Sequence, residues 1–158
     1  MSLTYSKKVI SHFRKPHNFG KIKNPTAVGK VGNVVCGDVM YLYLQVEGEV
    51  IKNVKFETYG CAAAIATSSV VTDLAKGKTL EAALKLTPQN VIESLDGLPA
   101  IKIHCSLLAL DALGEAVYDY WTKVGKKIPQ ELEEKHQRIE AHEKHGHEVI
   151  DNSNKNYR

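Results

Sequence analysis

The chain has 158 residues, of which 43% are hydrophobic and 25% charged, and its formal net charge is +3. This length suits one folded domain with a tail. The mild positive charge argues against a nucleic-acid-binding protein, which needs a concentrated basic surface. No apolar run approaches the ~20 residues that span a bilayer, and the N-terminus shows no secretory signal. We therefore expect a cytoplasmic protein, with no membrane or nucleic-acid partner and no disulfide framework among its three cysteines.

The N-terminal half predicts one short helix followed by strands. Residues 5–14 carry apolar side chains at helical spacing, and a loop rich in proline and glycine follows them. Residues 28–35, 39–46 and 50–59 are rich in β-branched and aromatic side chains, which favour strands. A hairpin turn at Gly48 joins the last two, so an antiparallel meander is the simplest arrangement.

The second half predicts helices, over residues 62–76, 79–86, 88–95 and about 105–123. Gly77 is the expected stop of the first. Thr79 and Thr87 are the expected N-caps of the next two, and Pro88 occupies the first helical position after Thr87. Strands followed by helices indicate an α+β domain, with a three-stranded antiparallel sheet and helices packed on one face.

The polar C-terminal region differs from the rest of the chain. Residues 129–144 are dense in charged side chains and histidine and predict a solvated helix. Residues 151–158 have little to bury and are expected to be disordered. We therefore divide the chain into a domain over residues 1–125 and a polar tail over residues 126–158.

Three cysteines carry the candidate chemistry. Cys36 and Cys61 each lie beside a glycine, and Cys61 and Cys105 each precede or begin a predicted helix. Backbone N–H groups and the helix dipole at such a position favour a thiolate, so we expect Cys105 to have a lowered pKa. We predict that all three thiols meet at one site. Buried structural cysteine remains the alternative, because the chain has no C-x-x-C pair.

Two further residues could complete a metal site. Asp38 lies two residues after Cys36, and His104 immediately precedes Cys105. Sulfur-rich tetrahedral sites select zinc or iron–sulfur clusters, and permanent clusters usually have four cysteine ligands. Three cysteines with a weaker fourth ligand therefore favour transient binding over storage.

Three motifs in this order resemble the U-type iron–sulfur cluster assembly scaffolds, the family of IscU and of the N-terminal domain of NifU. The resemblance covers about residues 5–124. The motifs are Val35-Cys36-Gly37-Asp38-Val39-Met40, Gly60-Cys61-Ala62-Ala63-Ala64-Ile65-Ala66-Thr67-Ser68-Ser69, and Leu98-Pro99 through His104-Cys105-Ser106.

The resemblance implies a scaffold, not an enzyme with independent turnover. Such a scaffold assembles a [2Fe–2S] cluster from iron and from sulfur supplied by a cysteine desulfurase, and transfers it to apo iron–sulfur proteins. A frataxin-like protein and an Hsp70-type chaperone are further implied partners. A cluster with three protein thiolates is partly open, so a cluster-linked homodimer is also expected.

The family's functional residues match positions in this chain. By resemblance, Cys36, Cys61 and Cys105 are the cluster ligands, and Cys105 is also the persulfide acceptor. Asp38 matches the aspartate that keeps the cluster labile, and His104 matches the other candidate for the fourth ligand. Zinc is the candidate occupant of the same site in cluster-free protein.

The loop of residues 98–102, which by resemblance matches the family's chaperone-recognition loop and is called the partner loop below, departs from the family pattern. The family has Leu-Pro-Pro-Val-Lys, whereas this chain has Leu98-Pro99-Ala100-Ile101-Lys102. Losing the second proline loosens the extended backbone and places chaperone recognition in question. Two alternatives stay open: a zinc-dependent SufU-like sulfurtransferase that accepts persulfide on Cys105, and a structural zinc domain. The chain lacks the SufU-type insertion between Cys61 and Cys105 and keeps His104, which favours the scaffold.

Overall fold

The computed structural model describes residues 4–33 and 37–155, and the side chains of Asn33 and of residues 144–155 lie outside that description. In chain order the elements are α1 (Lys7–Arg14), β1 (Ala27–Asn33), β2 (Asp38–Glu47), β3 (Val50–Tyr59), α2 (Ala62–Ala75), α3 (Leu80–Leu84), α4 (Pro88–Ser94), a 3₁₀ turn (Ala100–Lys102), α5 (Ile103–Lys123) and α6 (Gln130–Lys155). None of the described helices is long and apolar enough to cross a membrane.

The three strands form the predicted antiparallel meander, in the order β1-β2-β3. Gly48 and Glu49 both have positive φ in the turn that joins β2 to β3, as a tight hairpin requires. Side chains along β2 alternate between buried and half-buried, so one face of the sheet is covered and the other meets solvent.

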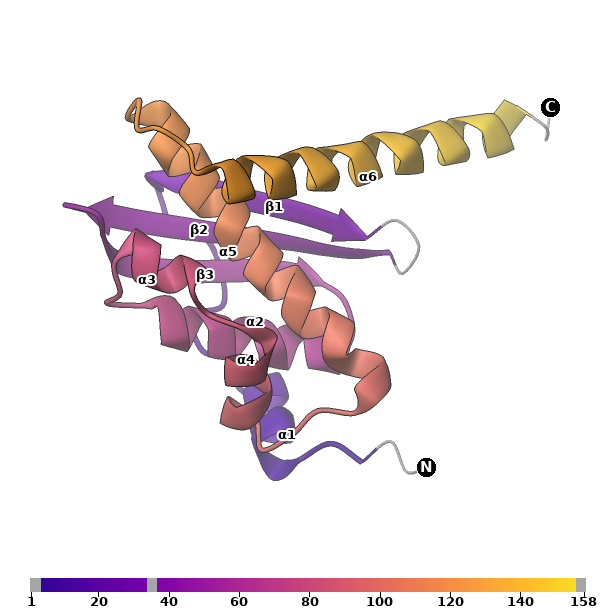
Figure 1. The fold of residues 1–158 in the computed structure, drawn as a ribbon. Helices are drawn as coiled ribbons and strands as arrows, with labels where there is room; N and C mark the ends of the chain where they lie inside the picture. The colour runs from indigo at the N-terminus through magenta and orange to yellow at the C-terminus, as the bar shows by residue number, and fades with distance from the viewer. Residues whose placement is uncertain (1–3, 34–36, 156–158) are drawn as a thin grey trace.

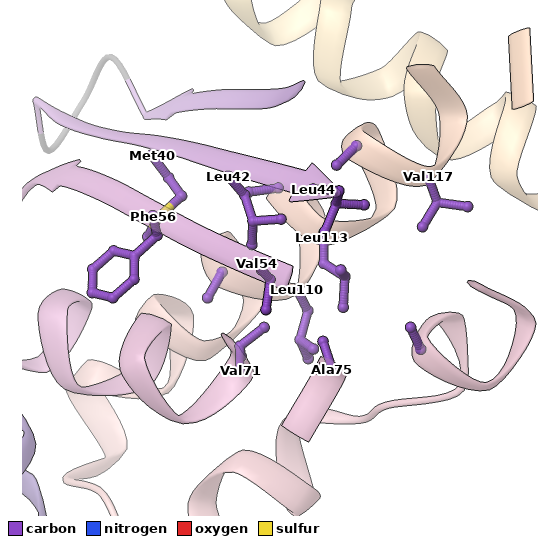
Figure 2. Close-up of a cluster of buried hydrophobic side chains, with 14 of the residues drawn as sticks. Met40, Leu42, Leu44, Val54, Phe56, Val71, Ala75, Leu110, Leu113 and Val117 are labelled. Atoms are coloured by element: carbon purple, nitrogen blue, oxygen red, sulfur yellow. The ribbon is translucent and has the colours of Figure 1, made fainter. Parts of the chain in front are cut away.

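Helices α2 and α5 cover one face of the sheet, and α1 packs on α2 (Figure 1). Figure 2 shows apolar side chains from β2 and β3 meeting those of α2 and α5 between the two layers. Leu42 and Phe56 from the sheet and Leu113 from α5 are almost fully buried there. The predicted α+β class, with helices on one face of a three-stranded sheet, is confirmed.

The predicted capping residues are confirmed. Thr79 Oγ1 accepts from the backbone N–H of Ala82. Thr87 and Asn90 form a reciprocal capping box, with Pro88 at the first turn of α4. Gly77 has a φ of +84° directly after α2 ends, a conformation that costs glycine little.

Some boundaries differ from the prediction. Helix α1 starts at Lys7 because Ser6 caps it, its Oγ accepting from the N–H of Val9 at 3.1 Å. Helix α3 ends at Leu84, and α5 begins at Ile103 because a 3₁₀ turn leads into it. The helical backbone of α6 continues to Lys155, beyond the expected end at Lys144 and through the first five of the eight residues expected to be disordered.

Helix α6 also packs more closely than the prediction of a solvated helix suggests. It lies against α5 and the β1 edge of the sheet (Figure 1). Leu132 is buried, and the His136 ring stacks on Tyr118 with centroids 3.8 Å apart. His136 Nδ1 also lies 2.8 Å from a Glu115 carboxylate oxygen. These contacts attach the first turns of α6 to α5.

Candidate metal centre

Asp38, Cys61 and Cys105 come together from three separate elements. Asp38 is the first residue of β2, Cys61 is the N-cap of α2, and Cys105 lies in the first turn of α5. The two Sγ atoms are 3.7 Å apart. One carboxylate oxygen of Asp38 and the two Sγ atoms all lie within 4.8 Å of one another. The predicted convergence is thus observed for these three side chains.

The backbone leaves the Cys61 thiol available to a ligand. Cys61 has the extended conformation of an N-cap residue (φ −75°, ψ 173°), but its side chain makes no capping hydrogen bond. The side chain of an N-cap residue usually accepts a hydrogen bond from a free backbone N–H in the first turn of the helix. Here the thiol instead faces Cys105.

Small residues allow the three donors to approach. A Cβ on Gly60 would lie 3.3 Å from Asp38 Oδ1 and 3.0 Å from the Cβ of Ala64. Ala63, Ala64 and Cys105 form a small buried cluster of their own beside the main core. Larger side chains at these positions would push the carboxylate and the thiols apart.

The prediction of a lowered pKa at Cys105 is wrong for the metal-free site. The residue has no exposed surface, and burial is the main cause that raises the pKa of its thiol to about 12. The nearby Cys61 and Asp38 raise this pKa further, whereas Lys102 lowers it. The helix terminus is present as predicted, but burial of the Cys105 side chain disfavours the charged thiolate.

Lys102 and His104 flank the thiols. The Lys102 ammonium has a raised pKa, chiefly because of the charge on Cys61. His104 is exposed, and its Nε2 lies 3.6 Å from Cys105 Sγ. Lys102 is therefore a source of positive charge, and His104 can turn a nitrogen towards the site.

The donor set fits a soft metal ion. In a tetrahedral centre with metal–sulfur bonds of about 2.3 Å, two thiolates are about 3.8 Å apart. The observed Sγ–Sγ distance of 3.7 Å is close to that value. A bound cation would also reverse the electrostatics that hold Cys105 protonated, because a coordinating thiol loses its proton. Two thiols and a carboxylate can therefore hold zinc, iron or one edge of an iron–sulfur cluster.

Other predicted site residues have mixed outcomes. Cys36 lies outside the described residues, so its place in the site stays a prediction. In the partner loop, Leu98 packs against the buried cluster around Cys105. Lys102 ends the 3₁₀ turn, and its N–H donates to the carbonyl of Pro99 at 2.8 Å. With alanine at position 100 the backbone curls into this turn.

Sequence reasoning missed Thr67. Its buried hydroxyl lies 3.3 Å from the carbonyl oxygen of Cys105 and 2.8 Å from that of Ala63. This contact joins α2 to the first turn of α5 directly behind the thiols. A threonine inside a predicted helix gives no local signal of a partner 38 residues away.

Comparisons with known proteins identify the family. The family described as NifU-like N terminal domain matches residues 4–127. The iron–sulfur cluster assembly scaffold protein IscU 1 of Archaeoglobus fulgidus is 57% identical over 122 residues, which cover 77% of this chain and 80% of the relative. IscU of Aquifex aeolicus is 43% identical over 150 residues, covering 90% and 96%.

Solved structures agree with this assignment. A candidate iron–sulfur cluster assembly scaffold for the SUF system from Fervidobacterium islandicum has a TM-score of 0.60 and 29% identity, covering 72% of this chain and 96% of that one. An N-terminal NifU-like protein from Brucella abortus has a TM-score of 0.58 at 22% identity, which supports the fold alone. Taken with the site described above, these matches show that the chain belongs to the NifU-like N-terminal domain family, which includes the IscU scaffold proteins.

Proposed function

We propose that this protein is a scaffold that assembles a transient [2Fe–2S] cluster and passes it to apo-proteins. The observation that carries the proposal is the meeting of Cys61, Cys105 and Asp38 at one site, with the two sulfur atoms 3.7 Å apart. Thiolates are the ligands that iron–sulfur clusters use. The names of the relatives, which describe iron–sulfur cluster assembly scaffolds, support the same function.

Cys36 is proposed as the third thiolate, because it lies only two residues before Asp38 in the sequence. Asp38 supplies a hard oxygen donor, which suits an iron–sulfur cluster less well than a thiolate does. An aspartate at this position therefore favours release. His104 is the other candidate for the fourth ligand, since its Nε2 lies 3.6 Å from Cys105 Sγ.

Cys105 is proposed to receive sulfur from a cysteine desulfurase. Its thiolate attacks the outer sulfur of the desulfurase persulfide. A new S–S bond forms on Cys105, the donor S–S bond breaks, and the donor cysteine leaves as a thiolate. Reducing the transferred sulfur to sulfide takes two electrons from an external reductant. Lys102 favours the attacking thiolate, because it lowers the pKa of Cys105.

The partners follow from this function. A scaffold has a sulfur donor and apo-protein acceptors, and we propose the cytoplasm as the place where they meet. A frataxin-like protein and an Hsp70-type chaperone are proposed to act at the site and at the partner loop. A second copy of the chain could cover a partly open cluster, and zinc could occupy the thiols between assembly cycles. We assign these roles to residues 1–125, with no independent enzymatic turnover.

Anaerobic reconstitution with ferrous iron, cysteine and a cysteine desulfurase tests the proposal. We expect the visible absorption of a [2Fe–2S] cluster, equal amounts of iron and acid-labile sulfide, and transfer of the cluster to an apo-ferredoxin. Cys61→Ser and Cys105→Ser should each abolish assembly. His104→Ala, which removes the other candidate for the fourth ligand, should lower the yield of assembled cluster. His142→Ala, which removes an exposed histidine on α6, is its matched control and should leave assembly unchanged.

Two results would count against the scaffold function. Persulfide on Cys105 with zinc retained and no chromophore would indicate a zinc-dependent sulfurtransferase instead. Zinc-bound thiols that neither form a cluster nor accept sulfur would indicate a structural zinc domain. Circular dichroism of each serine variant separates loss of a ligand from loss of the fold.

A further inference from the structure

A second group of metal-ligating side chains lies outside the cysteine site. His12 is on α1, His17 lies in the loop after α1, and Asp73 lies near the end of α2. One ligand atom from each lies within 4.8 Å of the other two. The His12 and His17 ring centroids are 4.6 Å apart, and His17 Nδ1 lies 2.5 Å from Asp73 Oδ2.

A buried hydroxyl positions both histidines. Ser69 has no exposed surface. Its Oγ lies 2.7 Å from His12 Nδ1 and accepts from the backbone N–H of His17 at 2.8 Å. Because Nδ1 of His12 is engaged by Ser69, Nε2 is the ring nitrogen left for a ligand. A partner on the other ring nitrogen orients a metal-binding histidine in most metal sites.

The carboxylate is oriented in the same way. Asn18 donates from its amide nitrogen to Asp73 Oδ1 and to Thr72 Oγ1, at 3.0 Å in each case. Oδ2 of Asp73 is thereby left on the side of His17. The two histidines and the aspartate are therefore held by neighbouring groups and do not gather by chance on flexible side chains.

We propose that His12, His17 and Asp73 form a second cation site that binds a divalent first-row transition-metal ion. Two imidazoles and one carboxylate are a common ligand set for ferrous iron and zinc, and leave positions open for water or substrate. With bonds of about 2.1 Å, tetrahedral ligand atoms lie about 3.4 Å apart. His17 Nδ1 and Asp73 Oδ2 are 2.5 Å apart. They would have to separate by about 0.9 Å, so that the ion replaces the hydrogen bond between them.

The site is separate from the cysteine site and differs from it in its ligands and in its exposure to solvent. Asp73 and Cys61 lie near opposite ends of α2, about 18 Å apart along the helix axis. The ion has no thiolate ligand and would join α1 and its following loop to α2. The site is also open to solvent, because the side chains of His17 and Asp73 are 56% and 42% exposed. A metal ion can thus enter and leave without opening the core.

Calorimetric titration with Zn²⁺ tests the proposal in the full-length Cys36→Ser/Cys61→Ser/Cys105→Ser variant, which removes the thiols. We expect one equivalent to bind. His17→Gln should weaken that binding at least about tenfold. Asn18→Gly should weaken it by a similar factor, because the Asp73 carboxylate loses the hydrogen bond that orients it. Glycine suits position 18, where φ is +56°. His142→Gln is the matched control and should bind as the parent does.

The proposal is overturned if the parent binds no zinc, if His17→Gln binds as tightly as the parent, or if His142→Gln loses the binding instead. If the serine background does not fold, the wild-type chain is used, and His17→Gln should reduce bound zinc from two ions per chain to one. Thermal melting gives a second readout: added Zn²⁺ should raise Tm in the parent and not in Asp73→Asn. An equal zinc-dependent rise in both would show that zinc stabilises the protein without Asp73, and would overturn the proposal.

Discussion

Replacing Gly29 with alanine is expected to force β1 and α5 apart. A Cβ at this position would lie 2.0 Å from the carbonyl oxygen of Ala112 and 2.6 Å from the amide nitrogen of Ala116. Real Cβ atoms essentially never approach another heavy atom within 3.0 Å. Both neighbours belong to the α5 backbone and cannot rotate away, so the helix must shift by about 1 Å. Glycine is thus required here for close packing.

The expected loss of stability follows from that clash. Overfilling a packed core costs about 1–3 kcal/mol, and a backbone clash puts this case at about 3 kcal/mol. Alanine restrains the unfolded chain more than glycine does, and this offsets about 0.5–1 kcal/mol of the lost stability. The net loss is about 2 kcal/mol, which corresponds to a Tm lower by about 4–8 °C for a chain of this length.

Gly32→Ala is the matched control in the same strand. Gly32 lies on the opposite face of β1, and its Cβ would find only Glu143 Oε1, at 3.9 Å. This variant should keep or gain stability, by up to about 1 kcal/mol. Urea unfolding and calorimetric melting of both variants give the comparison. Equal Tm values for Gly29→Ala and Gly32→Ala would refute the argument that α5 packs directly on the glycine.

Three further predictions concern the site and the core. Asp38→Ala should keep a reconstituted cluster longer than wild type in a transfer assay, and faster loss would contradict its role as a labile ligand. In metal-free protein, iodoacetamide should label Cys61 before Cys105. Because the pKa of Cys105 is raised to about 12, its labelling should accelerate about tenfold per pH unit above neutrality. Equal labelling rates for the two cysteines near neutral pH would disprove the argument that burial keeps Cys105 protonated. Trp121→Phe should lower the free energy of unfolding measured in urea by about 1 kcal/mol, because it removes the 2.9 Å hydrogen bond from Nε1 to Glu49 Oε2. An unchanged urea midpoint would show that this hydrogen bond adds no stability.

Features with a local cause could be predicted from the sequence. Thr79 and Thr87 cap helices because their hydroxyls reach a backbone N–H three residues ahead, and that geometry depends on few other parts of the fold. The hairpin at Gly48 could be predicted equally well, because the short segment between two strand-forming runs determines the turn. The convergence of Cys61 with Cys105 was expected from the kind of position each occupies and from the family resemblance.

Features set by tertiary packing could not be predicted. The pKa of Cys105 depends on how deeply α2 and the partner loop bury the first turn of α5, and a helix terminus alone gives the opposite direction. The packing of α6 depends on His136 finding Tyr118 and Glu115, which lie on α5 and carry no pattern that marks them as partners. Neither the burial of a residue nor its partners on other elements can be predicted from the sequence pattern of a single segment.

The group formed by His12, His17 and Asp73 shows the same limit at a candidate binding site. The two histidines lie near each other in sequence, but Asp73 comes 56 residues after His17. Asp73 looks like an ordinary surface residue of a helix, and it is exposed. Only the packing of α1 on α2 reveals that it faces an imidazole.

The size of the residues around the thiols explains why the site can form at all. Donors from β2, α2 and α5 meet only if the backbones that carry them approach closely, and large side chains would prevent this. Gly60 leaves room for the Asp38 carboxylate, and Ala63 and Ala64 leave room for the Cys105 thiol. The site is therefore assembled by the packing of three elements distant in sequence, so whatever separates α5 from the sheet should also separate Cys105 from its partners. A fragment lacking any one of these elements would lose a ligand and part of the packing that orients the others.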